Sequence, residues 1–188
     1  MSKNLSIGRK RQKGVVLLVG LMLLLVLTIL GVAASQSAII QEKLAGNYRD
    51  KSVAFEASEA GARWSTAWLQ SLGRGTLTRP FPCYTACDST SRVWNQGVYP
   101  AAPDPDDELW AAARQYGINP SDDSSVGVSV PLVHAQPGYI MEQQIFLRDD
   151  LAGESYKGVA FYRITARGTG ERSSSSAIVR AVIAKRFE

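Results

Sequence analysis

An uncharged apolar run near the N-terminus constrains this chain more than any other feature. The run extends from Val15 to Ala34, and its twenty residues include no charged side chain. At about 1.5 Å of rise per residue, a helix of this length reaches about 30 Å, which is enough to cross the hydrocarbon core of a bilayer. The sequence therefore predicts a transmembrane segment over 15–34.

The charges that precede the run predict its orientation. The first fourteen residues carry no acidic side chain and five basic ones, namely Lys3, Arg9, Lys10, Arg11 and Lys13. Such a cluster stays in the cytoplasm, so the N-terminus is expected there and the remaining chain in the periplasm. The run is longer than a typical signal-peptide core, although the small residues at 31–35 leave an ordinary signal-peptidase site as an alternative.

The formal net charge of +4 does not indicate a nucleic-acid partner. Five of the 21 Lys and Arg residues precede Val15, whereas all 17 Asp and Glu residues follow it. Without residues 1–14 the chain therefore carries 16 basic against 17 acidic side chains, formally −1. The basic excess belongs to membrane topology, and no basic patch with interleaved aromatic residues remains to predict nucleic-acid binding.

Helical character continues beyond the apolar run. The following residues include no proline before Pro80 and are rich in Ala, Gln, Glu, Lys and Leu, which favour helices. An apolar stripe at helical spacing starts at Ile40 and includes Trp64 and Trp68, which we expect in the core. We predict one helix over 15–72, with a lipid-facing first half and an amphipathic second half.

The remaining residues, 73–188, are expected to form one globular α+β domain in the periplasm. A segment of about 115 residues is long enough to bury its own core. We predict a short helix over 106–116, capped by Asp104. Alternating apolar residues predict four strands, over 127–133, 139–147, 159–167 and 177–187. The expected fold is a small antiparallel sheet packed on the second half of the long helix.

Two cysteines are separated by only three residues. In an oxidising compartment, Cys83 and Cys87 are expected to form a disulfide that closes a small local loop, although free thiols remain an alternative. The spacing is not the Cys-x-x-Cys of redox proteins. A zinc site would need more ligands than these two residues and His134, the single histidine.

Other side chains with chemical potential do not form a recognisable motif. The acidic groups at 104–108 and 122–123 have oxygen ligands that suit calcium, but their order does not match an EF-hand loop. His134 with Ser129 or with the serines at 173–176 lacks the Gly-x-Ser-x-Gly motif of serine hydrolases. We therefore predict a protein that is not an enzyme and has no cofactor and no metal site. The sequence leaves open whether Trp94 and Trp110 are packed or exposed.

Several elements at the N-terminus occur together and in a recognisable order. A basic leader ends at Gly14, apolar residues begin at Val15, and the segments 41–50 and 54–60 follow on a long helix. Residues 8–62 thereby resemble type IV prepilins, most of all the PilX branch of minor pilins. The strand Phe161-Tyr-Arg-Ile-Thr-Ala-Arg-Gly is a weaker match to the same family.

The resemblance implies how such a protein is processed and used. Residues 1–14 would be a leader, which a prepilin peptidase removes by cutting between Gly14 and Val15 before the new amino group is methylated. The subunit would span the inner membrane once and then enter the pilus. Its expected partners are the inner-membrane assembly machinery, other minor pilins and the major pilin through their N-terminal helices, and a tip adhesin. Its expected role is in a complex that primes pilus assembly, with effects on twitching motility and cell adhesion.

One position departs from the pattern of pilins that pack throughout a filament. Those pilins carry a glutamate at the fifth mature position, whereas this chain has Val19 there. A neutral residue leaves no partner for the amino group of a neighbouring subunit, so we hypothesise a position at the pilus tip. Two alternatives are a minor pseudopilin of type II secretion and a tip-displayed adhesion or aggregation module that acts through 79–126. A third is a periplasmic enzyme held by a signal anchor.

Overall fold

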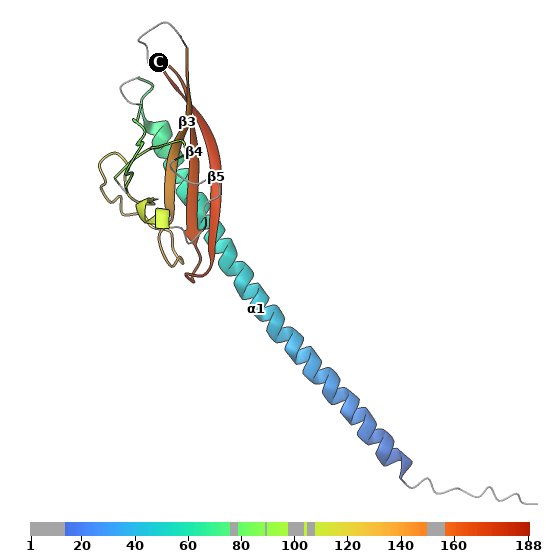
Figure 1. Cartoon of the computed structure of the whole chain (residues 1–188). Helices are drawn as coiled ribbons and strands as arrows, with labels where there is room; N and C mark the ends of the chain where they lie inside the picture. The colour runs from blue at the N-terminus through green and yellow to red at the C-terminus, as the bar shows by residue number, and fades with distance from the viewer. Residues whose placement is uncertain (1–13, 76–78, 89, 98–103, 105–107, 150–156) are drawn as a thin grey trace, which may run out of the picture. The chain divides into compact units, whose positions relative to one another are not determined.

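The computed structural model describes residues 14–75, 79–88, 90–97, 104, 108–149 and 157–188 (Figure 1). The predicted leader therefore lies outside the described residues, apart from Gly14. The chain divides into two compact units, Met1–Gly46 and Asn47–Glu188. In the described residues, the first unit contains the beginning of one helix, and the second contains the end of that helix together with a sheet.

The predicted long helix is confirmed as α1, Val15–Ser71, with 57 residues. In the first unit its side chains are exposed, and most of them up to Ala34 are apolar. By its length and composition α1 is able to cross a membrane. In the second unit α1 buries a stripe of mostly small residues, which allows the sheet to approach closely: Ala54, Ala57, Ser58, Gly61, Ala62, Ser65, Trp68 and Leu69.

The predicted α+β fold is confirmed, and the described part of the chain forms a sheet of five strands. Three long antiparallel strands form the body of the sheet, namely β3 (Gly138–Arg148), β4 (Gly158–Thr169) and β5 (Ser176–Phe187). Two short strands pair with β3: β1 (Trp94–Asn95) is parallel to it, and β2 (Arg114–Gln115) is antiparallel. The sheet is therefore mixed, in the order β1-β3-β4-β5 with β2 also beside β3. The three long strands are antiparallel as predicted, and the one parallel pair in the described sheet arises because β1 arrives from a long loop and not from a hairpin.

The predicted strand over 127–133 is wrong, because local features break the extended backbone there. Gly127 and Leu132 have φ angles of 73° and 59°, and Pro131 has no N–H to donate to a strand partner. The Gln136 side chain instead bonds to the backbone of Val130, accepting from its N–H at 2.8 Å and donating to its carbonyl at 3.1 Å. The segment is therefore held by a side chain and not by a sheet.

The predicted helix over 106–116 is also corrected. Only the 3-10 helix η2, Glu108–Ala112, is present in the described part of this segment, and residues 106 and 107 lie outside it. The Trp110 indole donates to the carbonyl of Asp104 at 2.9 Å, and Ala113 N–H bonds to the Trp110 carbonyl at 3.1 Å in the tight 3-10 pattern. Arg114 and Gln115 then join β3 as β2.

The core lies between α1 and one face of the sheet. On β4 the side chains that point toward α1 are fully buried, as the alternation in the sequence predicts: Ala160, Tyr162, Ile164 and Ala166. Trp68 is buried against them and Trp64 is packed at the margin, so the expectation for both is confirmed. The Trp64 and Trp68 indole N–H groups donate to the Ile118 carbonyl at 3.1 Å and to the Ser121 hydroxyl at 3.0 Å. Both indoles thereby connect α1 to the loop that follows β2.

Gly168 allows β4 to lie directly on α1. A Cβ atom at Gly168 would lie 2.3 Å from both the Ala54 carbonyl oxygen and the Ser58 nitrogen. Backbone atoms of a helix cannot move aside as a flexible side chain can. The distance between the helix and the sheet therefore depends on the missing side chain.

Two buried tyrosines should make the second unit sensitive to alkali. Tyr139 and Tyr162 are fully buried, and burial raises the pKa of each to about 12. The folded chain then holds both phenolic protons more tightly than the unfolded chain does. Stability should be retained below pH 10 and should fall between pH 10 and 12, by about 1.4 kcal/mol per pH unit for each tyrosine.

Unfolding of the full chain in detergent micelles at a series of pH values measures this loss. Tyr162→Phe should remove about half of the part of the slope that comes from these two residues. Tyr48→Phe is the matched control, since Tyr48 is 81% exposed and its replacement should leave the slope unchanged. A wild-type stability that stays constant from pH 9 to 12 would contradict the prediction.

Candidate functional site

The start of α1 contains the residues predicted for processing. Gly14 has a φ of 113°, a left-handed conformation that favours glycine, and lies just outside the helix. α1 begins at Val15, and the first helical bond runs from Leu18 N–H to the Gly14 carbonyl at 3.3 Å. Val19 is one turn further along, with 48% of its surface exposed. The peptide bond between Gly14 and Val15 therefore lies at the first residue of α1.

The apolar part of α1 satisfies its hydroxyl group internally. The hydroxyl of Thr28 donates to the Leu25 carbonyl at 2.7 Å, within the same helix. A polar group without such a partner would be costly in lipid or between packed apolar helices. The exposed side chains of 15–34 thus present an apolar surface that suits lipid or the helices of other subunits.

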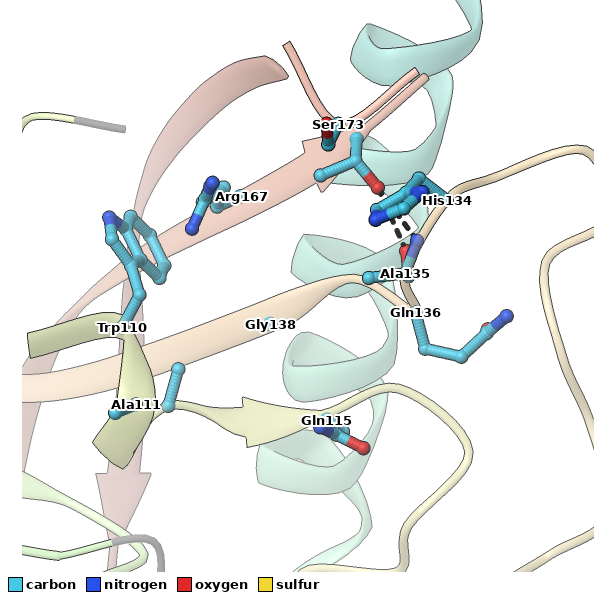
Figure 2. A pocket seen from close by; sticks show the side chains of 11 residues that line it. Trp110, Ala111, Gln115, His134, Ala135, Gln136, Gly138, Arg167 and Ser173 are labelled. Atoms are coloured by element: carbon cyan, nitrogen blue, oxygen red, sulfur yellow. Dashed lines mark hydrogen bonds between the residues drawn. The ribbon is translucent and has the colours of Figure 1, made fainter. Parts of the chain in front are cut away.

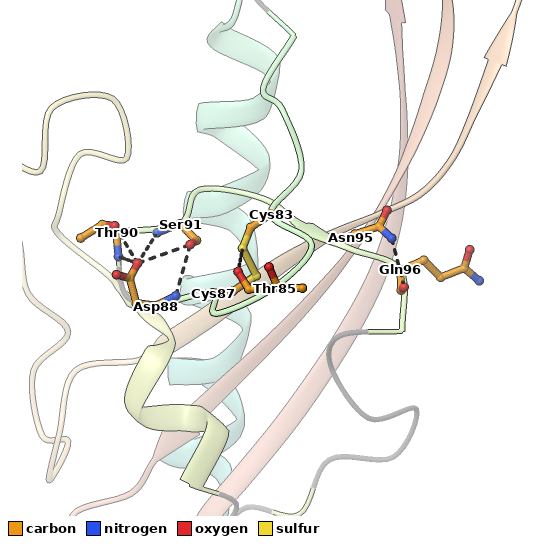
Figure 3. The surroundings of a disulfide bond; sticks show 8 residues. All are labelled: Cys83, Thr85, Cys87, Asp88, Thr90, Ser91, Asn95 and Gln96. Atoms are coloured by element: carbon orange, nitrogen blue, oxygen red, sulfur yellow. Dashed lines mark hydrogen bonds between the residues drawn. A yellow bond between two sulfur atoms is a disulfide. The ribbon is translucent and has the colours of Figure 1, made fainter.

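Cys83 and Cys87 are joined by a disulfide, with their Cα atoms 5.8 Å apart (Figure 3). The bridge closes a small loop directly beside β1. Cys83 N–H bonds to the Val93 carbonyl, and Asn95 N–H bonds to the Cys83 carbonyl, each at 2.7 Å. Chain-entropy arguments give so short a loop about 2 kcal/mol of stabilisation, so the bridge acts locally.

Polar and aromatic groups surround the disulfide. The Asp88 carboxylate accepts hydrogen bonds from Thr90 and Ser91, which lower its pKa below the usual value. Two aromatic side chains nearby are turned toward solvent, with Phe81 79% and Tyr84 65% exposed. Within the described part of 79–126, this loop therefore presents an aromatic surface on a covalently closed scaffold.

The face of the sheet that points away from α1 carries a buried ion pair. Glu142 on β3 is directly opposite Arg163 on β4, and the guanidinium donates two bonds of 2.8 Å to the two carboxylate oxygens. The Glu142 side chain is fully buried and that of Arg163 is 17% exposed. The bonds to Glu142 raise the pKa of Arg163 further above its usual range. The pair also supports β1, since Trp94 is the neighbour of Glu142 in the parallel register.

Trp94 and Trp110, for which the sequence did not decide between packing and exposure, lie on this same face of the sheet. Trp94 is 3% exposed and forms a second small core with Ala113 and Ile140. Trp110 packs against that cluster and is half-buried. Trp94 is therefore a core residue, whereas the side chain of Trp110 is partly exposed to solvent.

The candidate metal and catalytic residues are used in other ways. Within the described residues, no group of three or more His, Cys, Asp and Glu side chains is arranged to hold a metal. Asp122 accepts from Ser124, which lowers its pKa, and Asp123 pairs with Arg114. Asp106 and Asp107 lie outside the described residues.

The histidine and the serines come only partly together. His134 and Ser173 line the same cavity, but Ser129 does not belong to it. The backbone N–H of His134 donates to the Gly170 carbonyl at 2.6 Å. This bond holds the turn around His134 against the β4–β5 hairpin.

A long helix whose first part is apolar and whose last part packs on a small mixed sheet defines a pilin-like protein. Two family models match the sequence: PilX N-terminal over residues 13–63, and type IV pilus assembly protein PilX C-term over residues 68–185. The chain belongs to the PilX family. No curated protein and no solved structure matches it significantly.

Membership of this family indicates a minor pilin of type IV pilus assembly. Such proteins are structural subunits that associate with other pilus components and are not enzymes. Together with the apolar start of α1, the family indicates a subunit that is anchored in a membrane and incorporated into a pilus.

Proposed function

We propose that this minor pilin acts in a complex that primes pilus assembly and that it occupies a position near the pilus tip. The observation that carries the proposal is the arrangement at the start of α1, where Gly14 precedes the helix, Val15 begins it and the neutral Val19 follows one turn later. Residues 1–14 are the leader, 15–34 cross the inner membrane, and 73–188 are in the periplasm. The exposed apolar helix then passes from lipid to the helices of other minor pilins and the major pilin.

Processing at Gly14 separates this proposal from a simple membrane anchor. Mass spectrometry of the mature wild-type protein should find a methylated Val15 at the N-terminus. Gly14→Leu should leave the leader attached and prevent incorporation into pili. Gly20→Leu is the matched control, since neither glycine has a neighbouring atom where a Cβ would be placed, and this variant should be cleaved normally. A mature wild-type chain that begins anywhere else contradicts the assignment.

The position at the tip depends on Val19. A glutamate at this position of a shaft subunit pairs with the charged amino group of a neighbour, and a valine cannot do so. Labelled wild-type protein should therefore be found at pilus ends, and Val19→Glu should increase its incorporation along the shaft. Uniform labelling by the wild type would exclude a tip position.

A second function is adhesion or aggregation by a tip-displayed module. It is favoured by the exposed Phe81 and Tyr84 beside the disulfide loop, because exposed aromatic side chains are frequent contact residues. Deletion of the protein distinguishes the two functions, since loss of surface pili indicates priming and intact pili with lost attachment indicate adhesion. Co-purification with secretion components instead of pilus components would identify a type II minor pseudopilin.

A further inference from the structure

A polar cavity of about 290 Å³ opens on the face of the sheet that points away from α1 (Figure 2). Its wall is formed by η2, by the start of β3, by the end of β4 and by the turn around His134. Gly138 lines it without contributing a side chain, and a Cβ there would lie 3.2 Å from the Ala113 Cβ and 3.9 Å from the Trp110 ring. Neither the processing of the N-terminus nor the packing of α1 uses this cavity.

Arg167 is the one charged side chain that lines the cavity among the described residues. It is half-buried, and its Nε atom is buried without a hydrogen-bond partner among the described residues. Its Cζ atom lies 5.9 Å from the centre of the Trp110 ring, which stabilises the cation only weakly. Figure 2 shows Arg167 between Trp110 on one side and Ser173 and His134 on the other. A guanidinium that is partly removed from water costs free energy unless an anion or another acceptor compensates it.

Two other arginines on the same face are compensated by carboxylates, whereas the exposed Arg180 donates to the Thr165 hydroxyl at 3.3 Å. Arg163 is held by both oxygens of Glu142, and Arg186 donates to Asp149 at 2.6 Å. No carboxylate of the described chain lines the cavity beside Arg167. No described residue supplies a carboxylate that would complete the pattern for Arg167, and its guanidinium is therefore available to a carboxylate from another molecule.

We propose that this cavity binds a carboxylate group that belongs to a small chemical unit, such as one sugar ring or one amino-acid side chain. The planar fork of a guanidinium matches the two oxygens of a carboxylate, which makes such pairs short and directional. The exposed part of the Trp110 ring offers an apolar surface for the carbon atoms of the ligand. Gln115, His134 and Ser173 add hydrogen-bonding groups at the rim. The volume suits one sugar ring or one amino-acid side chain, so an acidic sugar and an acidic side chain of a partner protein share the required chemistry.

The test uses the full chain in detergent micelles and saturation-transfer NMR of four probes. D-glucuronate and D-glucose represent the sugar, and N-acetyl-L-glutamate and N-acetyl-L-glutamine represent the side chain. We expect at least one of the two carboxylates to bind at least tenfold more tightly than its neutral analogue. Tighter binding of glucuronate identifies an acidic sugar, and tighter binding of N-acetyl-glutamate identifies an acidic side chain. Equal signals from charged and neutral probes, or no signal from either carboxylate, would overturn the proposal.

Variants separate the cavity from general attraction to a basic surface. Arg167→Gln should weaken binding of the carboxylate at least tenfold, and Arg167→Lys should retain part of it because the charge is kept and the fork is lost. Arg172→Gln is the matched control on the nearby hairpin, where Arg172 donates to Asn47 at 3.4 Å, and it should bind as the wild type does. Melting curves of the variants verify that they are folded. Undiminished binding to a folded Arg167→Gln protein would exclude the site.

Discussion

Gly168→Ala is expected to destabilise the second unit by about 3 kcal/mol or more, because it forces β4 away from α1. The added Cβ would lie 2.3 Å from two backbone atoms of the helix and 2.8 Å from the Cβ of Ala57. Relief of these contacts requires the whole strand or the helix to shift. The buried layer of Tyr162, Ile164 and Ala166 would then lose contact with α1.

Denaturant unfolding of the full chain in micelles, followed by tryptophan fluorescence, measures the effect. Gly46→Ala is the matched control, because no atom lies within 4 Å of its added Cβ and alanine favours a helix, so stability should stay equal or rise. The stability of Gly61→Ala should lie between those of these two variants, since its added Cβ would lie 3.2 Å from the Cβ of Pro137. A Gly168→Ala protein as stable as the wild type would show that the helix and the sheet are not in close contact.

Removing one partner of the Glu142–Arg163 pair is expected to cost about 3–5 kcal/mol, because the other charge is left buried without compensation. Glu142→Met leaves Arg163 without both of its acceptors, and Arg163→Met leaves a carboxylate that is fully shielded from water. The double variant should recover most of this loss, since two apolar side chains suit the neighbouring Trp94 and Ile140. The interaction energy then appears as non-additivity between the two single changes.

The exposed pair Glu59–Arg63 on α1 is the matched control. Its side chains are 37% and 80% exposed, so Arg63→Met should change stability by less than about 0.5 kcal/mol. Additive effects of Glu142→Met and Arg163→Met would contradict the importance of the buried pair. The same variants should loosen the disulfide loop, because β1 pairs with β3 at Glu142.

Regular elements could be predicted from the sequence because their signals are local. The uncharged run and the helix formers after it predicted α1, and the alternation of apolar residues predicted β3, β4 and β5 within a few residues. The same alternation misled over 127–133, where Pro131, two positive φ angles and the Gln136 side chain decide the conformation. The prediction of a helix over 106–116 was wrong at its end, because Arg114 and Gln115 pair with a strand that lies more than twenty residues later in the chain.

The candidate sites also differ in whether their residues are close together in the sequence or only in the fold. Gly14, Val15 and Val19 were predicted from their order along the chain and stay predictions, whereas the disulfide predicted from the spacing of Cys83 and Cys87 is present in the structure. No pattern in the sequence connects Glu142 with Arg163, or Arg167 with Trp110, because these pairs are separated by 21 and 57 residues and meet only across the sheet. A half-buried arginine has no sequence signature of its own.

The sequence by itself predicted a membrane segment and its orientation, and it determined the family and the order of the long elements. Each of these depends on residues that are close together in the chain. The signals are the length of the apolar run, the basic residues that precede it, and the spacing of apolar residues along the helix and the strands. Only the tertiary structure decided how closely β4 approaches α1 at Gly168, which charges are paired on the far face, and where a cavity remains beside Arg167. These features depend on backbones and side chains that are brought together by the fold, and no local pattern specifies such distances.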